Sequence, residues 1–355
     1  MKKLSLLILL ALAACKQNKT KDRASEDVLQ KERISAVEID MLLQDSVSIR
    51  AVEIIDGDVA FAGSGGYYGI YNASQGKIRS SRQQYDGTFP DFRSVASTAN
   101  DFFMLSAGNP ALLYKTGPAG EMELVYQESG EKVFYDSMIF WNNQEGIAMG
   151  DPTAGCISIV ITRDGGNTWK KLPCDLIPAA VEGEAAFAAS DSNIAVVGDE
   201  TWIITGGMRS RVFYSPDKGR TWKVYNTPMV QGRSTLGAYS LDFFDRNTGF
   251  MIGGDYTAPE HNAANKAISH DGGKTWKVIA DGQDPGYKSS VRYVPGSRAK
   301  ELIAVGFTGI SYSQDGGASW KELSGEGFYT IRFLNDSVAY AGGKNRLARL
   351  RFKRK

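Results

Sequence analysis

Apolar and polar positions along the chain repeat one short unit: an apolar run of strand length, a polar or glycine turn, and a second apolar run that ends in glycine. Runs of this length between turn residues predict antiparallel pairs of β-strands. The unit occurs seven times, at residues 52–63, 94–108, 139–150, 186–198, 241–254, 291–306 and 331–342. About 300 residues divided among seven units give about 43 each, the length of four short strands with turns.

This periodicity predicts an all-β fold: a single seven-bladed β-propeller of four-stranded antiparallel blades. A six-bladed ring is the main competing count. The last unit leaves room for only three strands before the chain ends. We therefore expect an N-terminal strand, residues 34–43 or 47–50, to pair with the final blade and close the ring, so that no sheet edge stays open.

Four segments also align without gaps to the pattern S/T-x-D-x-G-x-T/S-W. An aspartate at a hairpin bend accepts backbone N–H bonds, and a glycine two residues later tolerates positive φ. The tryptophan begins the returning strand and packs on the sheet. The aspartates are 53, 54 and 44 positions apart. The aspartate and tryptophan of each segment are Asp164 and Trp169, Asp217 and Trp222, Asp271 and Trp276, and Asp315 and Trp320.

This pattern resembles the Asp box, or BNR repeat, of sialidases and of many non-enzymatic propellers, which implies a structural role for the boxes. Boxed hairpins joined to strand pairs ending in Gly-Gly or Gly-Asp are similar to the photosystem II stability/assembly-factor-like propellers. That resemblance implies a scaffold whose arginine-bearing face binds a partner protein or an acidic ligand during assembly at a membrane. The shared motifs are structural, so they specify fold better than function.

The N-terminus reads as an export signal. Two lysines precede an apolar stretch from Leu4 to Ala14, too short to span a bilayer. Residues 12–15, Leu-Ala-Ala-Cys, resemble the bacterial lipobox, which implies cleavage before Cys15 and its lipidation; an ordinary signal peptide with an incidental cysteine is the alternative. We expect a signal peptide at 1–14, a lipidated cysteine and flexible tether at 15–33, and the propeller at 34–355.

These features place the protein in the cell envelope, anchored to a membrane through the lipid on Cys15, on the periplasmic or outer-membrane face. Which membrane and which face stay open. The net charge of +1 argues against nucleic acid as a partner. The basic end, residues 346–355, is interpreted as a last strand with a solvated end, and contact with anionic headgroups is the alternative.

Cys156 and Cys174 flank the first Asp box, and the box centres its hairpin near residue 165. The two cysteines are therefore expected nearly opposite each other on adjacent strands, where a cross-strand disulfide is reasonable. Two small buried thiols are the alternative. A CxxC spacing is absent, which argues against a redox-active or zinc site.

Enzyme chemistry has little support. The chain has two histidines, which leaves no His-based triad or His-rich metal cluster, and it has no phosphate-binding fingerprint. We expect neither metal nor cofactor. Arg93, Arg292 and Arg332 stand at the starts of predicted inner strands. They resemble in part the three arginines with which sialidases hold a carboxylate.

By the same resemblance, further candidates for a ligand face or for weak catalytic roles are Tyr239, Glu184, Asp151, Asp199 and Asp255. The Arg-Ile-Pro entry motif of sialidases is absent. The leading hypothesis is a monomeric, membrane-anchored scaffold that binds a partner protein or acidic ligand. A sialidase-like hydrolase is the second hypothesis. A polysaccharide-binding surface protein is the third, based on Trp141, Trp202, Tyr67 and Tyr68.

Overall fold

The computed structural model describes residues 32–355. The predicted signal peptide, Cys15 and nearly all of the predicted tether lie outside the described residues. Residues 34–355 form one compact unit. Within the described part the regular elements are strands and one short 3₁₀ helix, η1 (Cys174–Leu176), and no helix there is long and apolar enough to cross a membrane.

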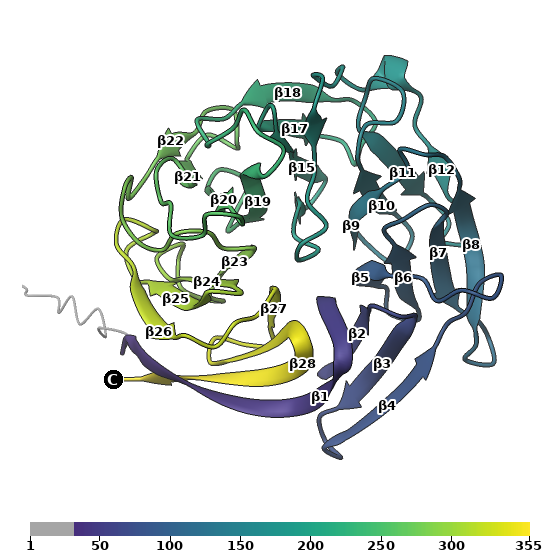
Figure 1. Ribbon diagram of the computed structural model, residues 1–355, viewed down its shortest axis with the longest axis horizontal. Coiled ribbons are helices and arrows are strands. Elements are labelled where there is room, and N and C mark those ends of the chain that lie inside the picture. Colours follow the sequence, from purple (N-terminus) through teal and green to yellow (C-terminus); the bar gives the residue numbers. More distant parts are fainter. Residues whose placement is uncertain (1–31) are drawn as a thin grey trace, which may run out of the picture. The chain divides into compact units, whose positions relative to one another are not determined.

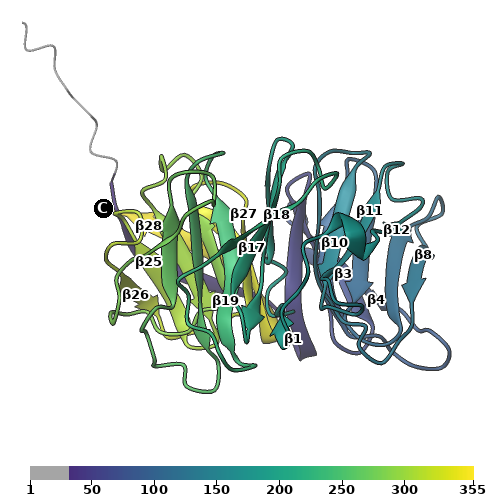
Figure 2. The ribbon, with the colours of Figure 1, turned by 90° about the horizontal axis from the view of Figure 1, so that it is seen from above.

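The sheets are arranged as a ring around a central axis (Figure 1), and in the second view their strands run between the two faces of that ring (Figure 2). Four sheets have four strands, each pairing with its neighbours in the order given. These sheets are β5 (Phe92–Ser97), β6 (Phe102–Ser106), β7 (Ala111–Thr116) and β8 (Met122–Glu128); β9 (Tyr135–Phe140), β10 (Gly146–Gly150), β11 (Ser158–Thr162) and β12 (Lys170–Lys171); β14 (Ile194–Val197), β15 (Glu200–Ile204), β17 (Arg211–Ser215) and β18 (Lys223–Asn226); and β23 (Ser290–Tyr293), β24 (Leu302–Gly306), β25 (Gly309–Ser313) and β26 (Lys321–Ser324).

Two further sheets have six strands. In order, one contains β13 (Glu184–Ala185), β16 (Gly206–Gly207), β19 (Leu236–Phe243), β20 (Gly249–Asp255), β21 (Lys266–Ser269) and β22 (Lys277–Val278). The other contains β27 (Thr330–Phe333), β28 (Val338–Arg354), β1 (Ile34–Ile55), β2 (Asp58–Gly63), β3 (Tyr67–Asn72) and β4 (Lys77–Arg82).

The propeller therefore has six blades, counted as hydrogen-bonded sheets, and the prediction of seven separate four-stranded blades is wrong. The physical reason is the continuity of β1. Its first part pairs with β28 and its second part pairs with β2, so the last repeat unit, the closing strand and the first repeat unit merge into one sheet. A periodic sequence pattern gives the number of repeat units, but it cannot show that one continuous strand pairs with strands of two different units.

Ring closure by an N-terminal strand is confirmed. β1 lies antiparallel beside β28, from the pair Ile34 and Arg354 to the pair Ser48 and Lys344 (Figure 1). Ion pairs follow this seam: Arg349 lies 2.9 Å from Asp40, and Lys353 lies 3.0 Å from Glu38. The acidic side chains of β1 thus balance the basic end of the chain, as cross-strand pairs do in other sheets.

The hydrophobic core fills the spaces between adjacent sheets. Trp202 of β15 is completely buried, and its ring stacks on Phe243 of β19 at 3.8 Å between centroids. Trp169 packs edge-on against Phe140, which in turn contacts Phe103 of the preceding sheet at 4.6 Å. Aromatic side chains of this size supply much of the burial that stabilises each interface.

Each Asp box ties its hairpin together with the same set of bonds. In the third box, Asp271 accepts the backbone N–H of Thr275 at 2.9 Å and its hydroxyl at 2.6 Å. The Ser269 hydroxyl accepts the Gly273 N–H, and the indole N–H of Trp276 donates to the Gly273 carbonyl, both at 2.9 Å. Every polar group of the box aspartate is used inside the turn, which agrees with a structural role.

The second glycine of the first box is required by packing. Gly166 has φ of 82°, in the left-handed region, and a Cβ at this position would lie 2.2 Å from a ring carbon of Phe103. A side chain would be strained twice, by the backbone conformation and by the ring of the neighbouring sheet. The box therefore also fixes how closely two sheets approach each other.

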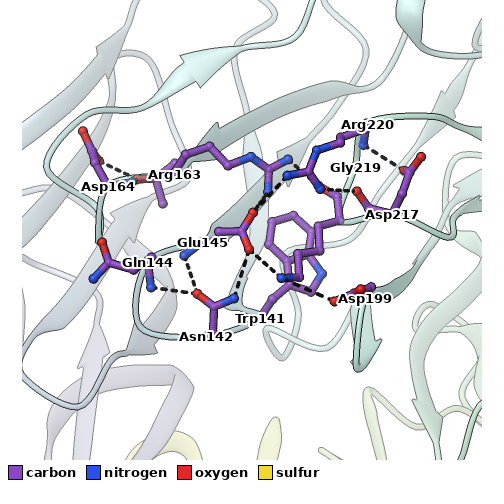
Figure 3. Close-up of polar contacts among 12 residues, drawn as sticks. Trp141, Asn142, Gln144, Glu145, Arg163, Asp164, Asp199, Asp217, Gly219 and Arg220 are labelled. Carbon is purple, nitrogen blue, oxygen red and sulfur yellow. Dashed lines mark hydrogen bonds and ion pairs between the residues drawn. The ribbon is translucent and has the colours of Figure 1, made fainter.

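Glu145, in the turn between β9 and β10, joins two Asp boxes (Figure 3). It lies 2.8 Å from Arg163 of the first box and 2.5 Å from Lys218 of the second. Partial burial opposes ionisation, but the bonds from Lys218 and its neighbours outweigh that cost and lower the pKa of Glu145 to about 2. Trp141 lies under the Arg163 guanidinium at 5.3 Å. This network links neighbouring sheets at their box-bearing ends.

Cys156 and Cys174 form a disulfide, with Cα atoms 5.6 Å apart. Neither cysteine lies in a strand, because Cys156 precedes β11 and Cys174 begins η1. The cross-strand placement expected from the sequence is therefore not the observed one. The bridge joins the loop before the first boxed hairpin to the segment that follows it.

A candidate ligand pocket at the channel mouth

Residues 186–193, called here the channel segment, form hydrogen bonds with strands of four different sheets near the axis of the ring. The sequence pattern predicts a strand pair over 186–198, but only β14, from Ile194, is a strand there, so that prediction is wrong. The reason lies in remote bonding partners. The Asp191 carboxylate accepts the Val95 N–H at 3.0 Å and the Ser94 hydroxyl at 2.7 Å from β5. It also accepts the Met138 N–H at 3.1 Å from β9.

Other atoms of the channel segment bond to further sheets. The Thr330 hydroxyl of β27 donates to the Ser190 carbonyl at 2.8 Å, and the Leu241 N–H of β19 donates to the Ser192 carbonyl at 3.0 Å. Arg332 donates to the Asp191 carbonyl at 2.7 Å. A segment whose polar groups are satisfied by several blades needs no strand partner of its own. Residues 186–189 of this segment also form one wall of a pocket.

A pocket of about 390 Å³, called here the mouth pocket, lies against the channel segment. Its walls are mostly aromatic. Phe187 stacks on Tyr239 at 3.8 Å between ring centroids, and Tyr287 meets Tyr239 edge-on at 4.9 Å. The lining residues are Arg50, Arg93, Phe134, Ala186, Phe187, Ala188, Ala189, Tyr239, Tyr256, Tyr287, Phe307 and Tyr329. Concave aromatic surface with a few polar groups is typical of ligand sites.

Two arginines give the mouth pocket its charge. The Arg50 guanidinium lies 4.0 Å from the centroid of the Tyr329 ring, a cation–π contact. Its buried Nε has no hydrogen-bond partner among the described residues. Arg93 pairs with Asp91 at 2.7 Å and donates to the Ala188 carbonyl at 3.1 Å.

Burial, and then the charge of Arg93, lower the pKa of Arg50. Two guanidinium groups therefore share one nearby carboxylate, that of Asp91, and repel each other. An anion entering the pocket would relieve that repulsion.

The other two predicted arginines lie elsewhere. Arg292 pairs with Asp242 at 3.4 Å, and Arg332 lies 3.9 Å from both Glu53 and Asp191. Burial, and then the charge of Arg332, lower the pKa of Arg292 to about 10. Neither side chain lines the mouth pocket. The structure thus places Arg93 apart from Arg292 and Arg332, and the three do not surround one carboxylate-sized site.

The remaining candidates are also dispersed. Tyr239 lines the mouth pocket, and its hydroxyl donates to the Thr235 carbonyl at 2.7 Å. The other four are carboxylates. Glu184 is paired with Arg211 at 2.5 Å, Asp255 with Arg233 at 2.8 Å, and Asp199 with Lys218 at 3.3 Å beside an Asp box, while Asp151 accepts the Ala186 N–H at 2.7 Å.

Residues that the sequence analysis missed complete the mouth pocket: Arg50, Phe187, Tyr287, Phe307 and Tyr329. Arg50 precedes the first repeat unit much as Arg93 precedes the second, and this shared position could have identified Arg50 as a candidate site residue. The aromatic residues come from loops with no common motif. Two of the aromatics proposed for polysaccharide binding have other roles, since Trp202 is in the core and Trp141 donates to the Thr201 hydroxyl at 2.8 Å.

Among residues 32–355, no group of three or more His, Cys, Asp and Glu side chains is arranged to hold a metal ion. The polar side chains that line the mouth pocket carry guanidinium and phenol groups. Such groups bind and orient an anion through charge-assisted hydrogen bonds.

Comparison with known proteins supports the fold. The BNR/Asp-box repeat family matches residues 267–278, the third box. A search of curated protein sequences finds no match. The chain is a β-propeller that carries a BNR/Asp-box repeat, and solved structures are similar to it over nearly its whole length.

One similar structure is YCF48 bound to D1 peptide, with 15% identity, a TM-score of 0.65, and coverage of 91% of this chain and 98% of that one. The RRP9 WD40 repeats have 10% identity, a TM-score of 0.63, and coverage of 90% and 100%. Virginiamycin B lyase from Staphylococcus aureus has 9% identity, a TM-score of 0.60, and coverage of 89% and 100%. Identities this low show the fold alone, and these neighbours include a peptide-bound propeller and an enzyme.

Proposed function

We propose that this protein is a binding scaffold of the cell envelope whose mouth pocket holds a carboxylate of a partner polypeptide. The observation that carries the proposal is the pair Arg50 and Arg93, two guanidinium groups with one neighbouring carboxylate, set in an aromatic pocket at the channel mouth. Burial strengthens a charge-assisted bond in such a site, and the aromatic walls add apolar contact. The similarity to a propeller bound to a peptide agrees with this class of partner.

The arrangement favours binding over sialidase-like hydrolysis. A sialidase-like site needs three arginines around one carboxylate, whereas Arg292 and Arg332 are engaged by buried acidic groups away from the mouth pocket. The hydroxyl of Tyr239 donates to Thr235, and Glu184 is paired with Arg211, so the two form no nucleophile pair with each other. Binding needs only the groups that the mouth pocket already holds.

The experiment is a binding assay on the soluble body, residues 31–355, with an array of labelled peptides that carry Asp, Glu or a free C-terminus, together with their amidated counterparts. Sialylated and uronic-acid glycans serve as the second set of probes. We expect carboxylate-dependent peptide binding that falls about tenfold or more in Arg50→Gln and in Arg93→Gln. The matched control is Arg79→Gln, which removes an exposed arginine on β4.

Glycan binding without peptide binding would overturn the choice of partner. Equal affinity of Arg50→Gln, Arg93→Gln and wild type for every probe would overturn the site itself. Turnover of a fluorogenic sialoside that depends on Arg93, Arg292 and Arg332 would replace the proposal with hydrolysis.

The membrane anchor is a separate part of the proposal and rests on the lipobox resemblance of residues 12–15. Acyl chains on Cys15 would hold the propeller at a membrane essentially permanently. Mass spectrometry of the protein purified from membranes should show a diacylglyceryl group on Cys15, and Cys15→Ser should release the protein into the soluble fraction. An unmodified Cys15 in the membrane-bound protein would refute the anchor and leave the mouth pocket unaffected.

A further inference from the structure

A second pocket of about 730 Å³ adjoins the mouth pocket, and Phe134 lines both. It lies between the loop that precedes β9, the loop that follows β10 and the segment that leads into β13. We call it the acidic pocket. Its lining residues are 131–134, 151–153, 155 and 180–185.

The charge of the acidic pocket is opposite to that of the mouth pocket. Its lining carries the carboxylates of Glu131, Asp151 and Glu182 against the single amine of Lys132, and none of these four forms an ion pair within the described residues. Glu184 lines the pocket as well, but Arg211 neutralises it at 2.5 Å. The acidic pocket therefore carries an excess of negative charge, and the adjoining mouth pocket carries an excess of positive charge.

Asp151 is the innermost of the unpaired carboxylates. Its Oδ1 accepts the Ala186 N–H at 2.7 Å, and its Oδ2 accepts no hydrogen bond from the described residues. Burial is the main cause that raises the pKa of Asp151, to about 6, so the group is largely ionised at neutral pH. Asp151 is half-buried, and a cation that reaches the free oxygen of such a carboxylate stabilises its ionised form.

A second carboxyl group nearby also lacks a partner. Asp136 of β9 is completely buried, and neither of its carboxyl oxygens has a hydrogen-bond partner in the described part of the chain. Burial, and then the charge of Asp151, raise the pKa of Asp136, while Arg93 lowers it. Asp136 thus interacts electrostatically with Asp151 of the acidic pocket and with Arg93 of the mouth pocket. A cation beside Asp151 would reduce the free-energy cost of burying both carboxyl groups.

We propose that the acidic pocket receives a lysine or arginine side chain of the same polypeptide whose carboxylate occupies the mouth pocket. The proposal rests on the proposed function and specifies its ligand: a segment that carries a carboxylate and a basic side chain on either side of Phe134. Phe134 lines the acidic pocket, and an ammonium or guanidinium group is attracted to the face of an aromatic ring. A glycan acid supplies the carboxylate without the cation, so a polypeptide is the ligand class that meets both pockets.

The test uses fluorescein-labelled peptides of eight residues in a Gly-Ser background, with one phenylalanine, one lysine and one carboxylate. The lysine and the carboxylate are separated by one, three or five residues. The carboxylate is a glutamate side chain in one set and the free C-terminus in the other, which distinguishes the two sources. Each peptide has a twin with norleucine in place of lysine and a second twin with an amide in place of the carboxylate. Affinities are measured by fluorescence anisotropy on residues 31–355.

We expect wild type to bind the best-spaced lysine peptide about fivefold more tightly than its norleucine twin. The preference should disappear in Asp151→Asn, in which the amide oxygen can still accept the Ala186 N–H. The double variant Glu131→Gln/Glu182→Gln changes two exposed side chains and carries the same test if Asp151→Asn folds poorly. Arg93→Gln should weaken the lysine and norleucine peptides equally. The matched control Glu123→Gln, on the outer strand β8, should change neither affinity.

The outcomes separate the two ideas. If lysine and norleucine peptides bind equally at every spacing while the amide twins bind weakly, the acidic pocket is not a cation site and the proposed function stands. If carboxylate and amide twins also bind equally, the proposed function and this inference both fail. A lysine preference that survives both Asp151→Asn and Glu131→Gln/Glu182→Gln would show that the cation binds elsewhere, which overturns the inference.

Discussion

Replacing Asp191 with asparagine should destabilise the whole propeller, although the change removes no atom from the core. Asp191 is buried with φ of 54°, a conformation that asparagine also tolerates, so the backbone adds little cost. Its Oδ1 accepts the Ser94 hydroxyl at 2.7 Å, the Ser137 hydroxyl at 3.0 Å and the Met138 N–H at 3.1 Å. Its Oδ2 accepts the Val95 N–H at 3.0 Å.

An asparagine can keep its oxygen at the Oδ1 position, but it then turns an NH₂ group toward the Val95 N–H. That buried N–H loses its acceptor at a cost of about 1–3 kcal/mol, and three charge-assisted bonds become neutral bonds of about half the strength. Relief from burying a carboxylate offsets part of this loss. We expect Asp191→Asn to lower the free energy of unfolding by about 3 kcal/mol.

Urea titration followed by tryptophan fluorescence measures this difference, provided that the slope of the transition stays unchanged. Asp86→Asn is the matched control, because Asp86 is also left-handed, with φ of 45°, but lies exposed in a loop. We expect a change below about 0.5 kcal/mol there. If Asp191→Asn changed the free energy of unfolding by no more than the Asp86→Asn control, the conclusion that the channel segment holds the blades together would be refuted.

Three further outcomes follow from the structure. The double variant Cys156→Ser/Cys174→Ser removes the disulfide between residues 18 positions apart, and it should lower the free energy of unfolding by about 3 kcal/mol in urea titrations. An unchanged urea midpoint after reduction of the wild type would contradict this. Partial burial opposes ionisation of Asp271, but the hydrogen bonds within its box outweigh that effect and lower the pKa of the carboxyl group. The stability that the ionised Asp271 contributes is therefore present above about pH 4 and is lost as the pH falls further. Urea midpoints measured from pH 5 to 2.5 should fall less steeply in Asp271→Asn than in wild type. Gly166→Ala should lose about 3 kcal/mol in thermal unfolding, whereas Gly57→Ala, with similar φ and open space around it, should lose about 1 kcal/mol; equal losses would show that backbone strain alone is the cause.

Local patterns predicted most of the strands. Six of the seven repeat units coincide with observed strand pairs, and the Asp boxes form the expected hairpins, because alternation and turn chemistry act between residues near in sequence. The blade count was wrong because β1 serves two repeat units, a property of pairing between the two ends of the chain.

The channel segment shows the other limit. Residues 186–189, Ala-Phe-Ala-Ala, fit a strand pattern by their composition, yet they bond to side chains of other sheets. The Arg93 guanidinium donates to the Ala188 carbonyl, and the Ala186 N–H donates to the Asp151 carboxylate. The site depends on the same distant contacts. Arg93 and Tyr239 were identified, but their neighbours Tyr287 and Tyr329 come from loops far along the chain. Without knowledge of which blades face the same mouth, no local motif could group them.

The pairing of β1 with β28 also constrains the order in which the chain can finish folding. Ile34 and Arg354 are partners across more than nine-tenths of the sequence, so the first sheet keeps an unpaired edge until the last residues of the chain arrive. Contacts between residues so distant in sequence slow folding and leave an incomplete chain open to aggregation. A chain that stops ten residues early would lack most of the partner for its own first strand. The ring can therefore close only after residues 346–354 have been synthesised.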